Sequence, residues 1–334
     1  MQVREWDPTS AATADVESWL SLLNDVLPCD LPDEPLWCTD HLQEYLAVNM
    51  PEERRLMWFA EADGKVLGAA SLLLVRGEAG VLTLLVRPDA RRDGVGRELL
   101  TAAAWRANSE RRRSVMVEVI AETPGVKFYE ACGFRRTLVE VRHRLALADV
   151  DWKRTAELAD QLASDYRIEY LPGGPGEELL EVYARAKLNL RHLPGDDADT
   201  DQLVSIEANR LRASIATLKR RGMRPYVVVA WHEPTRQVAG LTELVVPAHR
   251  PQRADQYDTL VVPAHRGYGL GLAMKAKMLM VVREEEPDVH DVVTWQTLEM
   301  EQMARVNSVL GFAPDREWYE YEADVPELLA NLSP

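Results

Sequence analysis

The stretch Val86-Arg-Pro-Asp-Ala-Arg91-Arg-Asp-Gly94-Val-Gly96-Arg97 decides the fold of the first half of this chain. A short apolar run at 81–86 leads into it and is bounded by turn residues, which is typical of a buried strand. A helical pattern follows, so its two glycines stand where a helix begins. The first backbone N–H groups of a helix lack partners, and glycine lets an anion approach them. The stretch therefore predicts a cradle for a diphosphate, to which Arg91, Arg92 and Arg97 add positive charge.

A second stretch, Val262-Pro-Ala-His-Arg266-Gly267-Tyr-Gly269-Leu-Gly271-Leu272, has the same character. Its arginine and two of its glycines repeat the Arg-x-x-Gly-x-Gly spacing of the first stretch. One such spacing is common by chance, but two in matching contexts are not. Neither stretch has the third glycine of a dinucleotide-binding loop, and neither has the Gly-Lys-Ser/Thr of a Walker loop.

Around both stretches the sequence predicts the same order of elements: strand, strand, strand, glycine loop, helix, strand, helix. In the first half the predicted ranges, after a helix at 15–26, are 56–60, 66–75, 81–86, 98–106, 115–120 and 126–131. In the second half, after amphipathic helices at 177–190 and 202–220, they are 226–231, 238–246, 257–262, 272–283, 289–296 and 303–310. We therefore expect an α/β (α+β) protein with two domains, 1–150 and 160–334.

The composition of the chain is that of a globular protein, with 46% hydrophobic and 28% charged residues among 334. It has no apolar run long enough to span a bilayer and no signal peptide, so we expect a cytoplasmic protein. Its three cysteines lack the spacing of a disulfide framework or a metal site. The formal net charge of −15 excludes nucleic acid and anionic membranes as partners and favours a cationic one.

A second motif closes each half: Val126-Lys-Phe-Tyr129-Glu-Ala-Cys-Gly133-Phe134 and Met303-Ala-Arg-Val-Asn307-Ser-Val-Leu-Gly311-Phe312. A strand, Arg-x-x-Gly-x-Gly, a helix, a strand and Phe-Tyr-x-x-x-Gly-Phe together resemble the GNAT superfamily of N-acetyltransferases, and Asn-x-x-Leu-Gly-Phe is a variant of its ending. Thr294-Trp295 also resembles tandem actinobacterial members. The resemblance covers most of both halves. It implies that each half has a mixed, mostly antiparallel central sheet flanked by helices.

The resemblance also implies that acetyl-CoA is the cofactor. The N–H groups of 92–97 and of 267–272 would hold its diphosphate. The end of the preceding strand would splay from its neighbour, pair with the pantetheine arm and polarise the thioester carbonyl. The implied cofactor-binding residues are Leu85, Val86, Arg87, Arg91, Arg92, Asp93, Gly94, Val95, Gly96 and Arg97, and Val261, Val262, Arg266, Gly267, Tyr268, Gly269, Leu270, Gly271, Leu272 and Asn307.

The implied reaction is direct attack of a neutral primary amine on the thioester, without a covalent enzyme intermediate. Tyr129 would donate a proton to the departing CoA thiolate. Asn307 stands in the matching place of the second half. An amide cannot act as a general acid at neutral pH, so Asn307 would instead form a hydrogen bond with the cofactor or cap the gap between the strands. Glu118 lies on the strand after the helix of the first loop, and Glu243 and Asp258 lie on neighbouring strands of the second half. All three are candidates for the general base. Each of these carboxylates equally suits a solvated strand face or an arginine partner.

Three hypotheses follow. The first half is catalytic through Tyr129, or the second half is catalytic, or one or both halves are acyl-CoA-binding or structural modules without turnover. The early helices at 177–220 favour the second, because such helices wall the acceptor site in this fold. Many family members have an asparagine at the start of the final helix, where Glu122 and Met300 stand here. The expected partner is a small-molecule amine, and we expect a monomer or homodimer.

Overall fold

The computed structural model describes residues 1–10, 12–188, 200–297 and 299–333, without the side chains of 200–202. The end of the helix predicted at 177–190 therefore lies outside the described residues. Within the described part of the chain, no helix is both long and apolar enough to cross a membrane.

The chain forms two compact units, Met1–Arg142 with Arg316–Pro334 and His143–Asp315. These ranges differ from the predicted domains 1–150 and 160–334 at both ends of the second unit. The chain passes from the first unit to the second within one strand, β6 (Arg135–Ala146), and returns at another, β12 (Ala313–Asp324). The returning strand belongs to the first unit because Trp318 to Asp324 pair with β5 of that unit, antiparallel.

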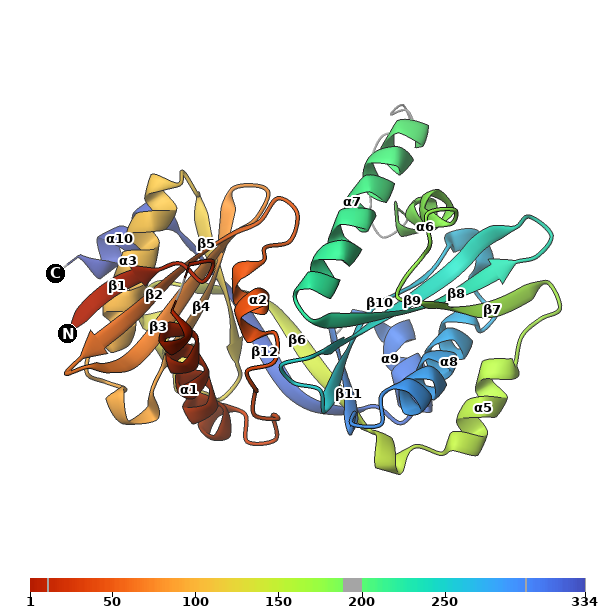
Figure 1. The fold of residues 1–334 in the computed structure, drawn as a ribbon, viewed down its shortest axis with the longest axis horizontal. Coiled ribbons are helices and arrows are strands. Elements are labelled where there is room, and N and C mark those ends of the chain that lie inside the picture. The colour runs from red at the N-terminus through yellow and green to blue at the C-terminus, as the bar shows by residue number, and fades with distance from the viewer. Residues whose placement is uncertain (11, 189–199, 298, 334) are drawn as a thin grey trace. The chain divides into compact units, whose positions relative to one another are not determined.

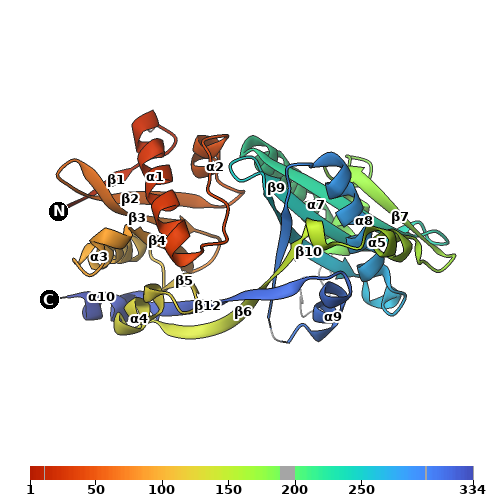
Figure 2. The same cartoon turned by 90° about the horizontal axis from the view of Figure 1, so that it is seen from below.

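The first unit is a sheet in the order β1-β2-β3-β4-β5-β12-β6, covered by helices on both faces. Helices α1 and α2 lie on one face, and α3, α4 and α10 lie on the other (Figure 2). Strands β4 and β5 are parallel, whereas β1 to β4 pair antiparallel. Its other elements are β1 (Gln2–Trp6), α1 (Thr13–Asp30), α2 (Leu42–Ala47), β2 (Arg54–Ala62), β3 (Lys65–Leu74), β4 (Ala79–Val86), α3 (Val95–Ser109), β5 (Ser114–Ile120), α4 (Pro124–Ala131) and α10 (Val325–Leu332).

The second unit repeats this plan with the order β11-β10-β9-β8-β7. Helices α6 and α7 cover one face of its sheet, and α5 and α8 cover the other (Figure 1). Strands β10 and β11 are parallel, and β7 to β10 pair antiparallel. Its elements are α5 (Trp152–Asp160), β7 (Tyr166–Pro172), α6 (Leu180–Lys187), α7 (Thr200–Arg220), β8 (Met223–His232), β9 (Gln237–Pro247), β10 (Arg253–Val261), α8 (Leu270–Glu285), β11 (Asp291–Thr297) and α9 (Glu301–Val309).

The two parallel strands at the centre of each unit separate toward their carboxyl ends. In the first unit, pairing of β4 with β5 stops at Leu82 with Val117, although β4 continues for another four residues. In the second unit, pairing of β10 with β11 stops at Asp255 with Val293, although β10 runs on to Val261. The register of β10 on β9 also shifts between Gln256 and Thr259, as at a β-bulge. Each unit therefore has an open V in its sheet.

Candidate functional site

The two glycine loops have the same backbone geometry. Left-handed conformations occur at Arg92 (φ 73°) and Gly94 (φ 83°) in the first loop, and at Gly267 (φ 89°) and Gly269 (φ 75°) in the second. Because glycine adopts this conformation without strain, Gly94 and Gly269 suit their places directly before α3 and α8. The repeat predicted from spacing alone is therefore a repeat of backbone conformation.

The arginine of each loop makes the same contact. Arg91 Nε donates to the carbonyl of Val86 at 3.2 Å, and Arg266 Nε donates to the carbonyl of Val261 at 3.3 Å. Each bond ties the loop back to the end of the strand that precedes it. The predicted residues of each loop are thus brought together at the open end of the V.

Helix α8 begins with backbone donors that have no partner inside the helix. No side chain caps it, and its first backbone bond runs from Ala273 N–H to the carbonyl of Gly269 at 3.1 Å. The N–H groups of 269–272 are left free of the helix ladder, with the partial positive charge of a helix N-terminus. These N–H groups are among those for which the sequence predicted a bound diphosphate.

A glycine on β9 permits the close packing beneath this cradle. A Cβ on Gly240 would lie 2.8 Å from the carbonyl oxygen of Leu260 and from Met274 Cε. Gly68 on β3 holds the equivalent place in the first unit, where a Cβ would lie 2.8 Å from the carbonyl oxygen of Leu85. Neither glycine belongs to a recognisable motif, so neither was predicted from the sequence to support the site.

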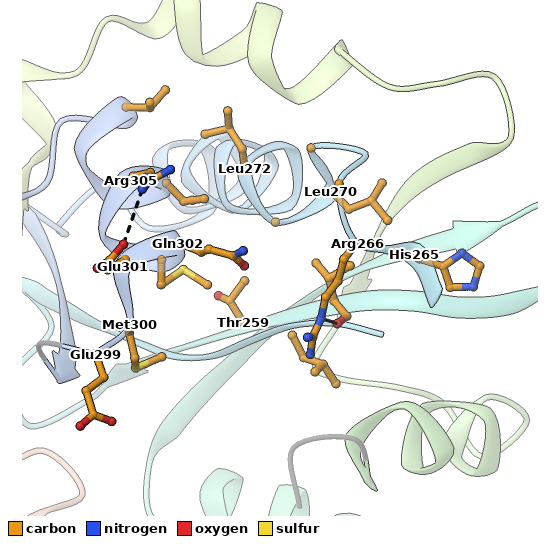
Figure 3. A pocket seen from close by; sticks show the side chains of 18 residues that line it. Thr259, His265, Arg266, Leu270, Leu272, Glu299, Met300, Glu301, Gln302 and Arg305 are labelled. Carbon is orange, nitrogen blue, oxygen red and sulfur yellow. Dashed lines mark hydrogen bonds and ion pairs between the residues drawn. The ribbon is translucent and has the colours of Figure 1, made fainter. Parts of the chain in front are cut away.

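A groove of about 800 Å³ opens in the second unit between the start of α8, the end of β10 and α9 (Figure 3). This volume lies within the range of small-molecule sites, roughly 300–1,000 Å³. The side chain of Arg266 lines the groove and, within the described part of the chain, makes no ion pair. The groove residues are Thr259, Leu260, Val261, His265, Arg266, Gly267, Gly269, Leu270, Gly271, Leu272, Glu299, Met300, Glu301, Gln302, Met303, Arg305, Val306 and Val309.

The first unit differs at this point because an aromatic ring lies against its loop. Phe128 of α4 places Cε2 and Cζ 3.4 Å from where a Cβ on Gly96 would stand. In the second unit the nearest atom to a Cβ on Gly271 is Val261 Cγ2, at 3.8 Å. Phe128 lies five residues before Gly133, and Val306 lies five residues before Gly311, so the two residues are equivalent. The smaller side chain leaves room at the start of α8.

Two of the three arginines of the first loop have protein partners. Arg91 makes two bonds to the carboxylate of Asp30, at 2.9 and 2.8 Å. Arg97 donates to the carbonyl of Asn331 at 3.0 Å, at the end of α10. Arg87 forms an ion pair with Asp25. Within the loop a carboxylate neutralises Arg91, whereas Arg97 bonds to backbone carbonyls and Arg92 makes no ion pair among the described residues.

Tyr129, the predicted proton donor, lies in the core of the first unit with 5% of its surface exposed. Its ring packs edge-on against Phe128 and Phe134, each at 5.1 Å between ring centroids. Burial, with a smaller contribution from Cys132, raises the pKa of its hydroxyl. The hydroxyl is therefore protonated at neutral pH, as a proton donor must be.

Two predicted base candidates, Glu243 on β9 and Asp258 on β10, share a lysine. Lys187 Nζ lies 2.6 Å from Glu243 Oε2 and 2.9 Å from Asp258 Oδ2. Tyr183 of α6 also donates to Glu243. Burial lowers the pKa of Lys187, but the two carboxylates outweigh burial and the pKa is raised. No motif marked Lys187 or Tyr183, because their role depends on how α6 packs on β9.

The third candidate, Glu118, lies in the first unit among other carboxylates. It stands opposite Glu320 on β12. Partial desolvation, then the charges of Glu140 and Glu320, raises the pKa of Glu118. Asn307, the predicted cofactor contact on α9, is fully buried and is not part of the groove lining. Within the described residues, no cluster of three or more His, Cys, Asp or Glu side chains suits a metal ion.

A glycine turn that joins a splayed parallel strand to an uncapped helix is present twice in the chain, and this fold is similar to that of tandem GNAT proteins. Residues 53–136 match the model of the acetyltransferase (GNAT) domain. The chain thus carries a GNAT acetyltransferase domain in its first unit, and its fold as a whole is that of tandem GNAT proteins. No curated protein sequence matches it.

Solved structures resemble the chain over nearly its whole length. A tandem GNAT protein from the clavulanic acid biosynthesis pathway is 24% identical with a TM-score of 0.83, over 97% of this chain and 98% of that one. A GCN5-related N-acetyltransferase from Sphaerobacter thermophilus is 15% identical with a TM-score of 0.65, over 97% of this chain and 95% of that one. At these identities the likeness concerns the fold.

Proposed function

We propose that the protein transfers an acyl group from an acyl-CoA, in the simplest case acetyl-CoA, to a primary amine, and that the second unit holds the thioester. The groove of that unit carries the proposal, because the free N–H groups of 269–272 lie along it. A diphosphate suits this cradle in charge and in hydrogen bonding. Arg266, on the rim, adds a cation without an acidic partner among the described residues.

The open V supplies the place for an extended arm. The ladder between β10 and β11 stops at Asp255 with Val293, and further along β10 the residues Leu260 and Val261 line the groove. An amide-containing chain pairs with a strand edge as a strand does. When bound, acetyl-CoA supplies an activated acyl thioester. A backbone N–H at the end of β10 then stabilises the oxygen of its carbonyl.

The acceptor side is formed by Glu243, Asp258 and Lys187, which together carry one net negative charge. Such a cluster favours an approaching ammonium and accepts the proton that the amine must lose. Glu243 is engaged by both Lys187 and Tyr183. The Asp258 side chain is 48% exposed and bonds to Lys187. We therefore assign the general base to Asp258 and a positioning role to Glu243.

The first unit has a supporting role in this proposal, because Phe128 lies against its loop and Arg87 and Arg91 are engaged in ion pairs. Tyr129→Phe is then expected to leave kcat within about twofold of the wild type, since the substitution removes one hydroxyl from a packed core. Release of CoA thiol in the presence of a good amine acceptor measures this. A loss of about tenfold or more would instead assign the chemistry to the first unit and to Tyr129.

A panel of primary amines, incubated with acetyl-CoA and followed by thiol release and product mass, tests the function itself. We expect at least one amine to be acetylated well above the rate without protein. If CoA binds but no amine raises thiol release above background, the alternative function holds, and the protein is an acyl-CoA-binding module without turnover. If CoA does not bind, both functions fail.

A further inference from the structure

A lysine is buried in α8 without an acidic partner. Lys275 is 1% exposed, and its Nζ donates to Asn307 Oδ1 at 2.7 Å. The same nitrogen lies 4.9 Å from the centre of the Phe312 ring. Among the described residues no carboxylate forms an ion pair with it, and burial of an unpaired ammonium is costly.

A chain of amides holds the partner of this lysine in place. Asn307 Nδ2 donates to Gln296 Oε1 at 2.9 Å, and Gln296 Nε2 lies 3.3 Å from His143 Nε2. All three side chains are buried. The bond from Asn307 to Gln296 directs the carbonyl oxygen of Asn307 at the ammonium, which fixes the position of the positive charge.

The packing of this fold does not require a charge here. Counted from the glycine loops, Lys275 corresponds to Leu100 of the first unit, and Asn307 corresponds to Tyr129. Leu100 and Tyr129 are both buried in the apolar core of that unit. The first unit therefore packs the equivalent position with Leu100 and Tyr129, without a charge. Since the stability of this fold does not need a charge there, the buried charge of the second unit indicates a function.

The charge lies one layer behind the groove. Gly271 and Leu272 line the groove from α8, and Lys275 follows them by one helical turn, about 5.4 Å along the axis. Val306 lines the groove from α9, and Asn307 is the next residue. The ammonium thus stands behind the wall that these two helices form, in surroundings of low dielectric where its field is little screened.

We propose that the ammonium of Lys275, held by Asn307, stabilises the negative charge that forms on sulfur when the C–S bond of the bound thioester breaks. The inference rests on the proposed function. In that step the amine nitrogen bonds to the acyl carbon, the C–S electron pair goes to sulfur, and the proton of the amine passes to Asp258. Lys275 transfers no proton. It acts through its field, as a positioning residue does, in place of the tyrosine hydroxyl at the matching site of the first unit.

The charge state of Lys275 makes the role measurable. Burial lowers its pKa to about 7, and no neighbouring charge on α8, α9, β11 or β12 contributes to this shift. The titratable group that the amide chain reaches is His143. The ammonium, and with it the stabilisation of the thiolate, is therefore lost as the pH rises through about 7. A bound anionic sulfur opposes this loss and raises the pKa of Lys275.

Lys275→Met removes the charge and keeps an unbranched side chain that is one heavy atom shorter. With a weakly basic amine that stays neutral across the pH range, we expect kcat to fall by about 30-fold, as for loss of one preorganised charge, with the KM for acetyl-CoA little changed. The fall of kcat above pH about 7 in the wild type should be absent in the variant. Lys277→Met, on the same helix and partly exposed, is the matched control and should behave as the wild type.

A second variant, Lys275→Leu with Asn307→Tyr, recreates the pair of the first unit and guards against a misfolded single variant. We expect it to fold and to recover part of kcat, with the fall in rate moved above the ordinary pKa of tyrosine, about 10, because burial raises the pKa of Tyr129 at the matching place. A merely structural lysine predicts that both variants melt at lower temperature than the wild type and share its pH profile. That result would overturn the inference.

Two readouts need no turnover. In the unfolded chain Lys275 keeps its proton up to about 10.5, whereas in the folded chain it releases it near 7, so wild-type stability gains from rising pH across this window. Lys275→Met should remove this gain, so the stability of the variant relative to the wild type should be greatest below pH 7. The ¹⁵N resonance of Nζ should titrate near 7 in the free protein. It should titrate at least one unit higher with the sulfonate formed by oxidation of CoA bound, because a thiol is largely neutral near pH 7 whereas a sulfonate is an anion. An unchanged midpoint with the sulfonate bound would refute the inference, even if no amine is ever acetylated.

Discussion

Gly271→Glu is expected to abolish acyl-CoA binding, with a loss of affinity of about 100-fold or more, because it places a carboxylate where a diphosphate would lie. Gly271 lines the groove at the second position of α8. The backbone tolerates the change, since a Cβ there meets nothing closer than Val261 Cγ2 at 3.8 Å. An acidic residue in the first turn also favours the helix dipole. Calorimetric titration with CoA measures the loss, and thermal melting shows that the variant folds.

Two controls sharpen this result. Gly271→Ala adds the Cβ without the charge, so it should bind CoA and gain up to about 1 kcal/mol of stability from better helix propensity. Gly96→Glu makes the same change in the first unit, where Phe128 lies 3.4 Å from the new Cβ. It should leave CoA affinity and turnover intact. The reverse pattern, with binding lost only in Gly96→Glu, would move the cofactor site to the first unit.

Four strands were not predicted from the sequence: β1, β7 and the two in which the chain passes between the units, β6 and β12. Every range predicted as helix or strand overlaps a described helix or strand of the same type. These central segments have apolar residues at the regular spacing of a helix or in the short runs of a buried strand. Strands β6 and β12 are rich in charged residues and largely half-exposed, so they lack such a period. Which sheet a strand joins depends on pairing with residues far away in the sequence. The pairing of β12 with β5 has no local signature.

The candidate site divides in the same way. Spacing located both glycine loops, since their conformation depends on local residues. It did not distinguish the loop that lines the groove from the loop against which Phe128 packs, because that difference lies in Phe128 and Val306, on helices that follow later. Lys275 did leave a sign: it interrupts an apolar run on α8, and a helix that is apolar on all sides buries its lysine.

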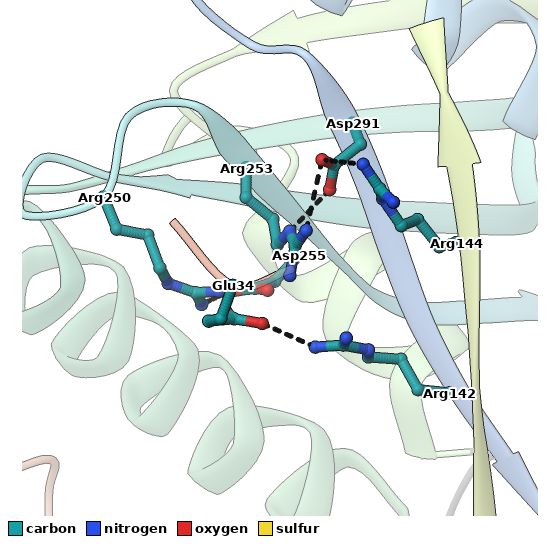
Figure 4. A network of polar contacts seen from close by, with 7 residues as sticks. All are labelled: Glu34, Arg142, Arg144, Arg250, Arg253, Asp255 and Asp291. Atoms are coloured by element: carbon teal, nitrogen blue, oxygen red, sulfur yellow. Dashed lines mark hydrogen bonds and ion pairs between the residues drawn. The ribbon is translucent and has the colours of Figure 1, made fainter. Parts of the chain in front are cut away.

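Asp291→Asn is expected to destabilise the second unit by about 3–5 kcal/mol, as when one partner of a buried ion pair is removed. Arg253 is fully buried, and its Nε and Nη2 both donate to the carboxylate of Asp291 (Figure 4). Arg144 donates to the same carboxylate at 3.1 Å. An amide neutralises neither guanidinium. The midpoint of urea unfolding, followed by fluorescence, measures the loss.

The same substitution tests how the open V is held. Arg253 and Asp291 are directly paired residues of β10 and β11, at the closed end of the parallel ladder, only two residue pairs from the point where pairing stops. Their ion pair therefore joins the strands whose separation makes room for the pantetheine arm. Replacing both by apolar residues, Arg253→Met with Asp291→Leu, should recover most of the stability, because packing substitutes for a buried pair. If this double variant is stable yet binds CoA as poorly as Asp291→Asn, the ion pair sets the geometry of the V. If it binds CoA normally, any apolar contact suffices to close that end, and the groove depends only on where β10 and β11 part.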